Sequence, residues 1–308
     1  MYGPEYENII REICKKIGIE YRLYDNRCAV LSQKNHKELI WSRRFPHNTS
    51  SSSRAIDSKY VCSLILHSAG LPVVPHLKLY RSDTEGYVSQ NDTSQRICER
   101  ILDMNDGVVI KPNNSCEGKN VYACFSAKEI ESALLLAFRA KEILAASPYI
   151  KSNNEYRVFF LNGECLLAYR KIRPYVIGDG YSSLKLLIAK STAQSENTIQ
   201  SLDLNCIPSE GEKIEIGWKF NLSCGGSVEI VDDYLLKESL FSLTKRAAEA
   251  INAKFVTVDF LENDKTKELL ILEINAGVAM DQFILKHMQG KEIAYSIYEK
   301  AIRDLFKL

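Results

Sequence analysis

The sequence predicts an α+β protein, because long β-like runs gather together and are flanked by helical segments. The chain has 308 residues, enough for about two domain-sized units. Apolar residues make up 45% and charged residues 26%, which is typical of a globular protein. This composition excludes a disordered chain, a collagen-like repeat and a coiled-coil rod. Long antiparallel β-runs flanked by helices also disfavour a doubly wound sheet.

The first segment, up to about residue 45, predicts one helix and two strands. Isoleucines recur at helical spacing up to Ile17, and Gly18 ends the run. Residues 21–31 alternate weakly, as in a short hairpin. Residues 47–53 are polar, with four consecutive serines, and predict a loop.

Residues 60–77 carry no Asp, Glu, Lys or Arg and are nearly long enough to span a membrane. They also contain Gly70, Pro72 and Pro75, which a lipid-exposed helix tolerates poorly. We therefore expect a buried helix over 57–69, a turn and the start of a strand, and no membrane segment.

The rest of the chain mixes apolar runs with helical periodicity. Strands are expected at residues 107–111, 121–125, 149–150, 156–161, 165–172, 255–261 and 269–274. Helices are expected at residues 126–140, 182–190, 233–251 and 291–308. Ser126 and Glu129 form a capping box at the start of the first of these helices.

The net charge is close to neutral, with 40 basic and 39 acidic residues. A nucleic-acid binder usually has a basic excess or a basic stripe, so no nucleic-acid partner is expected. Residues 1–16 are charged and lack an apolar core, which predicts no signal peptide and a cytoplasmic location. The nine cysteines are scattered without a C-x-x-C pair, which favours reduced thiols over a zinc site or a disulfide framework.

Neither of the two common phosphate loops is present. No G-x-G-x-x-G follows a strand, and residues 113–120 have Asn113 and Asn120 where a P-loop has Gly and Ser or Thr. Lys111, however, leaves an apolar strand just before this small polar loop, where its ammonium and the loop amides could meet phosphates. The alternative is an ordinary hairpin with a solvated lysine.

Three polar residues stand near the ends of the last two predicted strands. Glu273 and Asn275 are two apart, so they point to the same face, and Asp259 could lie across from them in a hairpin. Burying two carboxylates is costly unless something neutralises them, and a hard cation with oxygen ligands does so. The alternative is that these side chains face solvent.

Two further motifs suit an anionic ligand. Arg157 and Arg170 lie on predicted strands, and arginines that face a cleft recognise phosphate or carboxylate groups. The loop 221–226 ends in Gly225-Gly226, which allows the backbone to approach a ligand closely.

Taken together and in this order, these segments resemble the ATP-grasp superfamily, in the branch of cyanophycin synthetase and the ATP-grasp part of bifunctional glutathione synthetase. The resemblance covers about residues 50–290. The matching motifs are Asp57-Ser58-Lys59 with Gly70-Leu71-Pro72, Val109-Ile110-Lys111-Pro112, Glu155-Tyr156-Arg157, Val176-Ile177-Gly178-Asp179-Gly180, Asn221-Leu222-Ser223-Cys224-Gly225-Gly226, Asp259, and Glu273-Ile274-Asn275-Ala276.

The chain also departs from the family's pattern. Ser147-Pro148 stand at the hinge beside the adenine, where relatives usually have one or two glutamates. This difference leaves the preference for ATP over GTP undecided. The loop 113–120 has one glycine where relatives have two or three, and Ser58 separates an aspartate and a lysine that are adjacent in the family. A different segment at 280–283 suggests a different acceptor.

The resemblance implies an ATP-grasp fold, in which two α+β subdomains grip ATP, with a short N-terminal α/β domain. The expected domains are residues 1–50 (N-terminal), 51–147 (lid-bearing subdomain) and 148–308 (subdomain with the metal site).

The resemblance also implies an ATP-dependent carboxylate–amine ligase that forms an amide through an acyl phosphate. Its expected cofactors are ATP and two Mg²⁺, for which Mn²⁺ can substitute. The expected catalytic residues are Arg157, Arg170 and Lys171. The expected ATP-binding residues are Lys59, Lys111, Ser115, Gly118, Tyr149, Ile150 and Glu155. Asn221, Ser223, Gly225 and Gly226 are expected around the acyl phosphate, and Asp259, Glu273 and Asn275 at the metal.

The expected partners are a small-molecule carboxylate and an amine, such as amino acids or peptides, and a homodimer is common in such ligases. Two alternatives stay open. One is an enzyme of the same fold that acts on a non-amino-acid substrate. The other is a degenerate nucleotide-binding module, which is suggested by Ser147-Pro148 at the adenine hinge and by the single glycine in the loop 113–120. A nucleic-acid binder is disfavoured by the neutral charge.

Overall fold

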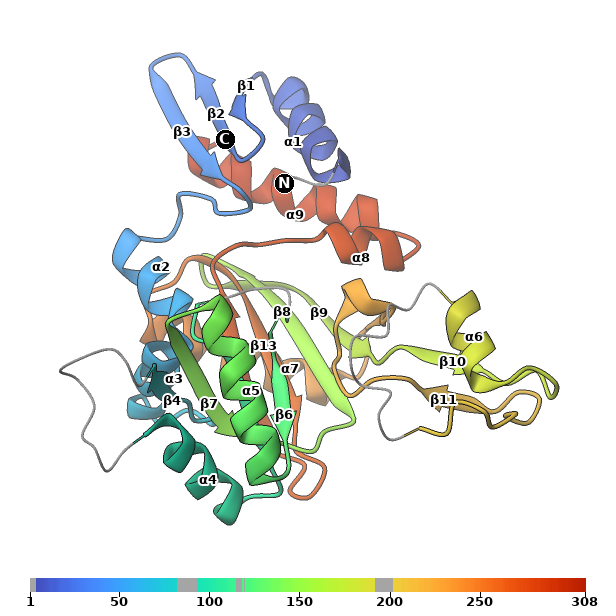
Figure 1. The fold of residues 1–308 in the computed structure, drawn as a ribbon. Helices are drawn as coiled ribbons and strands as arrows, with labels where there is room; N and C mark the ends of the chain where they lie inside the picture. Colours follow the sequence, from blue (N-terminus) through green and yellow to red (C-terminus); the bar gives the residue numbers. More distant parts are fainter. Residues whose placement is uncertain (1–3, 82–92, 115–117, 119, 192–201) are drawn as a thin grey trace.

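The computed structural model describes residues 4–81, 93–114, 118, 120–191 and 202–308. The predicted ATP-binding residue Ser115 lies outside this part of the chain. The described residues build four antiparallel β-sheets with helices packed on them (Figure 1). This architecture confirms the predicted α+β class. Within the described ranges, the helices are too short or too polar to cross a lipid bilayer.

An N-terminal unit packs a helix on a three-stranded sheet. It comprises α1 (Pro4–Ile17), β1 (Glu20–Asp25), β2 (Cys28–Gln33) and β3 (His36–Trp41). Helix α9 (Gly290–Phe306), from the far end of the chain, lies beside α1 and shares its core (Figure 1). The prediction of two strands here was wrong, because β3 buries only Ile40 and therefore alternates too weakly to be recognised.

Two short helices, α2 (Ser50–Asp57) and α3 (Lys59–Ser68), connect this unit to the rest. The polar loop predicted over 47–53 is helical from Ser50 onward. The reason is a cap: the side-chain oxygen of Thr49 accepts a hydrogen bond from the Ser52 N–H at 3.1 Å.

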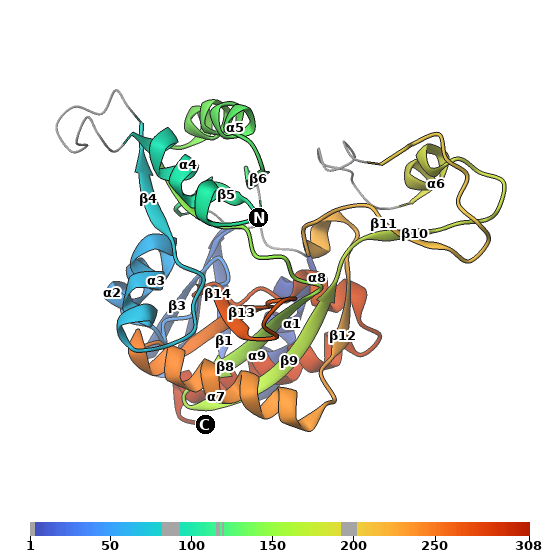
Figure 2. The same cartoon turned by 90° about the horizontal axis from the view of Figure 1, so that it is seen from below.

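A four-stranded sheet follows, in the order β4-β7-β5-β6. Its elements are β4 (Leu77–Tyr80), α4 (Ser94–Met104), β5 (Val108–Pro112), β6 (Tyr122–Cys124), α5 (Ala127–Ala140) and β7 (Ile143–Pro148). Helices α4 and α5 pack on the sheet around one apolar core (Figure 2). The Ser126 half of the predicted capping box is confirmed, because Ser126 Oγ accepts from the Glu129 N–H at 3.3 Å. The Glu129 carboxylate accepts from the Phe125 N–H at 2.6 Å, one residue before the N–H that a capping box uses.

Two elements of this sheet were not predicted, and one prediction was wrong. Helix α4 and strand β7 had no expected counterpart, and the expected strand at 149–150 is absent. Tyr149 instead leaves the sheet, and its N–H donates to the Gly107 carbonyl at 2.9 Å.

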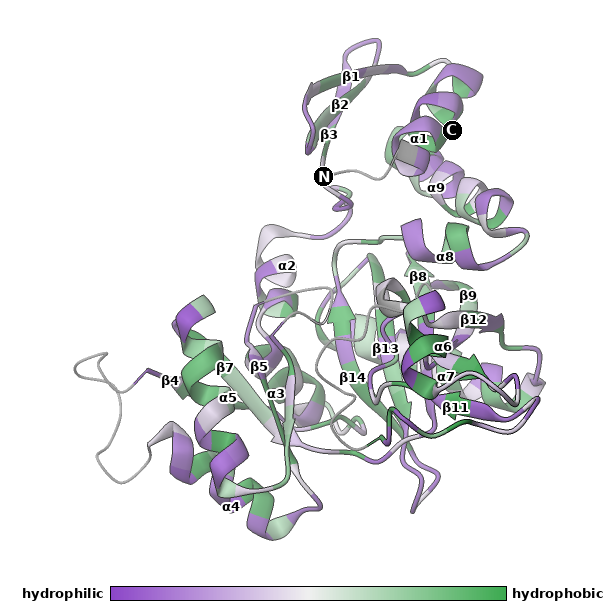
Figure 3. Ribbon diagram, turned by 45° about the vertical axis from the view of Figure 1, so that its right-hand side comes forward, coloured by the Kyte–Doolittle hydropathy of each residue, from purple (hydrophilic) through white to green (hydrophobic). Residues whose placement is uncertain are grey.

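The five-stranded sheet has the order β12-β9-β8-β13-β14 and is covered on both faces. Its elements are β8 (Asn154–Leu161), β9 (Glu164–Ile172), β12 (Ser227–Ile230), α7 (Tyr234–Ala250), β13 (Phe255–Glu262) and β14 (Leu269–Asn275). Helices α3 and α7 cover one face, whereas the N-terminal unit, α8 (Asp281–Lys286) and α9 cover the other. In Figure 3, α1 and α9 carry hydrophobic and hydrophilic residues side by side, as expected of helices with one buried face.

A smaller lobe projects from the five-stranded sheet (Figure 2). It contains β10 (Tyr175–Ile177), α6 (Leu184–Lys190) and β11 (Lys213–Glu215), and a short 3₁₀ turn, η2 (Leu222–Cys224), leads back to β12. Free thiols are found at Cys14, Cys28, Cys62, Cys98, Cys124, Cys165 and Cys206. The domain boundaries at residues 50 and 147 stay a prediction.

Candidate functional site

One cavity of about 870 Å³ lies where the N-terminal unit, the four-stranded sheet and the five-stranded sheet meet. Trp41 lines it from the first, Lys111 from the second and Asp259 from the third. Segments that are far apart in the sequence therefore build its walls.

The pleat and register of the five-stranded sheet bring the charged residues together. Side chains two residues apart share a face, so Asp259 lies on the face that buries Phe255 at the other end of β13. On one neighbouring strand Arg157 pairs directly with Asp259, and on the other Glu273 does. The predicted hairpin is thus present, with Asp259 across from Glu273.

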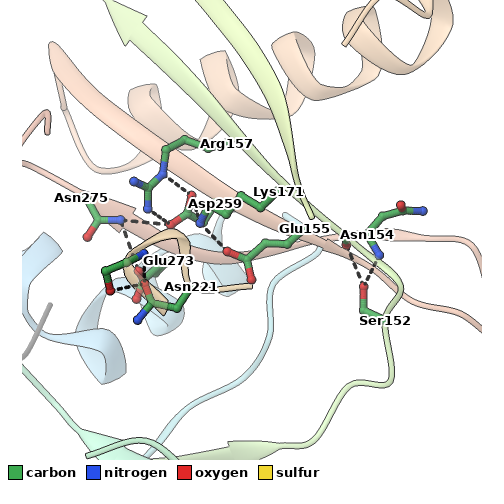
Figure 4. Close-up of polar contacts among 10 residues, drawn as sticks. Ser152, Asn154, Glu155, Arg157, Lys171, Asn221, Asp259, Glu273 and Asn275 are labelled. Carbon is green, nitrogen blue, oxygen red and sulfur yellow. Dashed lines mark hydrogen bonds and ion pairs between the residues drawn. The ribbon is translucent and has the colours of Figure 1, made fainter. Parts of the chain in front are cut away.

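Asp259 is the centre of a network of ion pairs (Figure 4). Arg157 donates two hydrogen bonds to its two carboxylate oxygens, each 2.6 Å long. Lys171 Nζ lies 3.2 Å from Asp259 Oδ1 and also forms a salt bridge with Glu155. Asn275 Nδ2 donates to Asp259 Oδ2 at 3.4 Å and to Glu273 Oε1 at 3.3 Å.

These partners set the charges of the buried groups. Asp259 is 1% exposed, and burial alone would raise its pKa, but Arg157 and Lys171 lower that pKa to about 2. Burial and the charge of Arg157 disfavour protonation of Lys171, yet Asp259 and Glu155 outweigh both and raise its pKa. Asp259 and Lys171 are therefore charged at neutral pH, whereas burial raises the pKa of Glu155 against the opposing charge of Lys171.

Two more lysines reach the cavity from the opposite side. Lys59, the first residue of α3, has its Nζ 3.6 Å from Glu273 Oε2. The pKa of Lys111, at the end of β5, is lowered to about 8, chiefly by burial. The negative charge of Glu273 raises this pKa, and the positive charge of Lys59 lowers it.

Asn113 holds these two lysines in place. Its carbonyl oxygen accepts from the Lys59 N–H at 3.1 Å, and its side-chain oxygen accepts from the Tyr60 N–H at 3.1 Å. Its amide nitrogen donates to Ser58 Oγ at 3.0 Å. Asn113 thus ties the start of α3 to the loop that follows Lys111. Sequence analysis treated it only as a departure from a P-loop.

One end of the cavity is aromatic. Tyr149 packs edge-on against Trp218, with ring centroids 5.9 Å apart, and both residues line the cavity with Ser147 and Ile150. Aromatic and apolar surface of this kind suits the flat ring of a nucleobase.

The loop between β11 and β12 closes another side. Gly226 packs so tightly that a Cβ there would lie 2.8 Å from the Ile172 carbonyl oxygen. Asn221 lines the cavity, and its side-chain oxygen accepts from the Ser223 N–H at 3.1 Å. Lys219 Nζ donates to the Gly118 carbonyl at 3.5 Å, so this loop touches the segment after β5.

Most of the predicted site residues line the one cavity. They are Lys59, Lys111, Gly118, Tyr149, Ile150, Glu155, Arg157, Lys171, Asn221, Ser223, Asp259, Glu273 and Asn275. Gly225 and Gly226 shape the loop beside it but do not line it. Arg170 does not line it either, because β9 turns its side chain to the opposite face, where it pairs with Glu229.

Sequence reasoning missed several lining residues. Arg44, Asp57, Trp218 and Lys219 line the cavity without having been assigned a role. Asp57 was noted in a motif, and Trp218 and Lys219 stand just before the recognised Asn221 loop. Proximity to known motifs was the only signal in the sequence that could have found them.

The donor atoms fit a hard cation. Asp259 and Glu273 supply the carboxylate oxygens that Mg²⁺ prefers, whereas Asn275 turns its amide nitrogen toward them and would have to turn its amide oxygen inward to bind the ion. In the described part of the chain no cluster of three or more His, Cys, Asp or Glu residues has the spacing of a metal site. The two carboxylates and the amide therefore form at most a sparse site, as expected for an ion held largely by phosphates.

Two sheets that face each other across a cation-rich cavity define the class: the chain has the ATP-grasp fold, which confirms the resemblance inferred from the motifs. The bifunctional glutathione synthetase from Pasteurella multocida matches with a TM-score of 0.59 and 19% identity, over 98% of this chain and 44% of that one. The D-alanine–D-alanine ligase from Bacillus anthracis matches with a TM-score of 0.55 and 15% identity, over 83% of this chain and 68% of that one.

Sequence comparison finds similar relatives, although no family model matches the chain. A glutathione biosynthesis bifunctional protein from Streptococcus agalactiae serotype V is 24% identical over 188 aligned positions, and the match covers 52% of this chain and 24% of that protein. A cyanophycin synthetase from Synechocystis sp. is 24% identical over 308 residues, covering 89% of this chain and 33% of the relative. The chain therefore spans about a quarter to a third of these relatives.

Proposed function

We propose that the protein is an ATP-dependent carboxylate–amine ligase that forms an amide or peptide bond through an acyl phosphate. The observation that carries the proposal is the cavity that combines an aromatic end with a central group of four cations and three carboxylates. These are Lys59, Lys111, Arg157, Lys171, Glu155, Asp259 and Glu273. Relatives named for glutathione biosynthesis, cyanophycin synthesis and D-alanine–D-alanine ligation support it.

In the proposed reaction, a substrate carboxylate oxygen attacks the γ-phosphorus of ATP, and ADP leaves. The amine of the second substrate then attacks the acyl carbon, phosphate leaves, and the amine loses a proton. Phosphoryl transfer needs positioning and charge neutralisation more than covalent chemistry by the protein. The excess of cations over carboxylates around the cavity suits that requirement.

We assign roles from the family resemblance, for residues that line the cavity. Lys59 and Lys111 bind the α- and β-phosphates, and Glu155 accepts the ribose hydroxyls. Arg157 and Lys171 balance the charge of the transferring phosphoryl group. Asn221 and Ser223 bind the acyl phosphate through their amide and hydroxyl groups.

Asp259, Glu273 and Asn275 would hold Mg²⁺, two ions in the full proposal, with Mn²⁺ as a substitute. When bound, the metal neutralises phosphate charge and acts as a Lewis acid. A cytoplasmic location and a homodimer stay predictions.

The test is ADP release from Mg-ATP with pooled amino acids and short peptides, followed by mass spectrometry of the products. We expect release that needs both substrates and a product mass equal to donor plus acceptor minus water. Glu273→Gln should reduce the rate by about 10³-fold, the size of effect seen when a charge-stabilising group is lost. A product of any other composition would contradict the proposal.

One observation favours a second candidate, a nucleotide-binding module without turnover. Both carboxylate oxygens of Asp259 are taken by Arg157, which competes with a metal for the same atoms. Binding of ATP without ADP release from any carboxylate would support this candidate. Turnover of a carboxylate without amino acids would instead support an enzyme of the same fold with a different substrate.

A further inference from the structure

A second, smaller groove lies at the edge of the four-stranded sheet. It has a volume of about 320 Å³ and is bounded by α3, the edge strand β4 and α4, which lie side by side in Figure 1 and Figure 2. We call it the β4 groove, and its lining residues are Tyr60, Leu77, Lys78, Tyr80, Ile97 and Arg100. None of these six residues lines the larger cavity, so the proposed reaction does not use them.

The lining combines aromatic rings, aliphatic side chains and cations. Tyr60 and Tyr80 offer aromatic surface. Lys78 Nζ lies 4.8 Å from the centre of the Tyr80 ring, so an ammonium group is held against that surface. Arg100 contributes a second positive charge, and the six lining residues include no carboxylate. Apolar surface with a few polar groups that fix orientation is typical of small-ligand sites.

Hydrogen bonds tie the two walls of the β4 groove to each other. The Ser63 hydroxyl donates to the Tyr60 carbonyl on α3 at 2.9 Å. It also accepts from the N–H of His76, the residue directly before β4, at 3.3 Å. Ser63 is 5% exposed, so this bridge is shielded from water. The Tyr60 N–H in turn donates to Asn113 Oδ1, so the same wall is connected to the loop after Lys111.

The β4 groove also shares a sheet face with the candidate site. Lys78 on β4 and Lys111 on β5 both pair with Ala145 on the strand between them. Directly paired residues point to the same face, so the two lysines share one face and stand two strands, or about 10 Å, apart. Coulomb repulsion over such a distance changes a binding constant about 2- to 10-fold.

We propose that the β4 groove binds a small aromatic anion, with one ring and one phosphate or carboxylate group, and that this anion weakens nucleotide binding in the cavity. The ring packs on the two tyrosines, and the anionic group meets Lys78 and Arg100. The bound negative charge then opposes the phosphates that Lys111 attracts. The weakening rests on the proposed nucleotide site, whereas binding in the groove does not.

The first test is calorimetry of phenyl phosphate with the nucleotide-free protein. Inorganic phosphate lacks the ring, benzyl alcohol lacks the charge, and benzoate replaces the phosphate by a carboxylate. We expect phenyl phosphate or benzoate to bind with a Kd at least tenfold below the Kd of inorganic phosphate and of benzyl alcohol. Equal affinity for phenyl phosphate and inorganic phosphate, together with no benzoate binding, would overturn the proposal.

Lys78→Gln and Arg100→Gln locate the binding. Each variant should raise the Kd of the tighter of the two aromatic anions about tenfold, since a hydrogen bond to a charged group is lost. An unchanged Kd in both variants would place the anion elsewhere and would overturn the proposal. Circular dichroism checks that both variants are folded.

Lys213→Gln is the matched control. Lys213 Nζ lies 4.1 Å from the centre of the Tyr175 ring in the smaller lobe, so it makes the same kind of cation–ring contact outside the β4 groove. Its removal should leave the Kd of the aromatic anion unchanged. A tenfold rise in this variant would contradict the assignment to the groove.

A second titration measures the effect on the nucleotide. A non-hydrolysable ATP analogue with Mg²⁺ is titrated with and without the saturating aromatic anion. We expect the Kd of the analogue to rise about 2- to 10-fold in wild type, and by less than twofold in Lys78→Gln. No rise in wild type, or an equal rise in Lys78→Gln, would overturn the coupling. An analogue that fails to bind at all would contradict the proposed function, while the first titration still decides the groove.

Discussion

Lys111 and Lys171 are equally buried, each 6% exposed, yet their pKa values are shifted in opposite directions in the two sheets that carry them. In the four-stranded sheet, burial lowers the pKa of Lys111 to about 8. In the five-stranded sheet, burial acts on Lys171 in the same direction, but Asp259 and Glu155 raise its pKa. Partners, and not depth, decide whether a buried lysine keeps its charge.

The difference comes from strand register. Glu155 pairs directly with Lys171 on the neighbouring strand, and Asp259 lies one strand further on the same face. Lys111 sits among apolar strands, and of the described residues none forms a salt bridge with it. Asp259 and Glu155 thus find their cations within the five-stranded sheet, whereas the four-stranded sheet presents a cation that an anionic ligand would stabilise.

The largest expected loss of stability comes from breaking the ion-pair network around Asp259. Asp259→Asn leaves Arg157 and Lys171 short of a partner in a buried site. We expect the free energy of unfolding to fall by about 3–5 kcal/mol at pH 7, as for other buried ion pairs that lose one member. Urea denaturation measures this.

The pH dependence of that effect has a definite sign. The carboxyl of Asp259 has its pKa lowered from 3.8 to about 2 in the folded protein, so its stabilisation is full above pH 4 and is lost as the pH falls from about 4 to 2. Glu229→Gln, which removes an exposed partner of Arg170, is the control and should cost less than about 1 kcal/mol. Equal losses in the two variants would contradict the comparison.

Replacing each lysine by methionine should change stability in opposite directions. Lys171→Met leaves the Glu155 carboxylate buried without its cation and should cost about 3 kcal/mol. Lys111→Met removes a desolvated charge and should be neutral or stabilising, by up to about 2 kcal/mol. Denaturation midpoints of the two variants at pH 7 provide the measurement, and destabilisation of both by the same amount would show that burial alone governs them.

Lys111 should also make nucleotide binding depend on pH. Its pKa of about 8 means that the free protein loses this charge as the pH rises through 8, while bound phosphates favour the protonated form. We expect ATP affinity to fall up to about tenfold per pH unit above pH 8, with proton uptake on binding at pH 8. Calorimetry in two buffers of different ionisation enthalpy detects that uptake.

Lys111→Arg is the control for the pH effect, because a guanidinium stays charged throughout this range. The variant should bind ATP without proton uptake near pH 8. Persistence of the uptake would assign it to another group.

The smallest effect is expected for Arg170→Gln. Its guanidinium pairs with Glu229 at a surface where the side chains are 41% and 57% exposed, outside the cavity lining. Loss of this pair should cost less than about 1 kcal/mol and should change kcat less than about threefold. A loss near 10³-fold would instead support the catalytic role predicted from the sequence.

The candidate site was predictable to different degrees in its different parts. Asp259, Glu273 and Asn275 could be placed together because they lie on one hairpin, where the period of two and a short turn decide which side chains meet. The roles of Lys59 and Lys111 were inferred from a motif resemblance. The positions of the two lysines depend on Asn113, because its three hydrogen bonds to residues 58–60 join segments that are more than fifty residues apart. Arg170 has the same residue type as Arg157 and also stands on a strand, but the two point to opposite faces.

Local chemistry in the sequence determined the α+β class, the helix cap at Ser126 and the sharing of one face by Glu273 and Asn275, because each depends on neighbours within a few residues. Tertiary structure alone decided that Arg157 meets Asp259, 102 residues away, and that Arg44 from the N-terminal unit reaches the same cavity. Strand register and the packing of separate units follow from burying apolar surface over the whole chain. No local pattern can therefore specify which distant charges become partners.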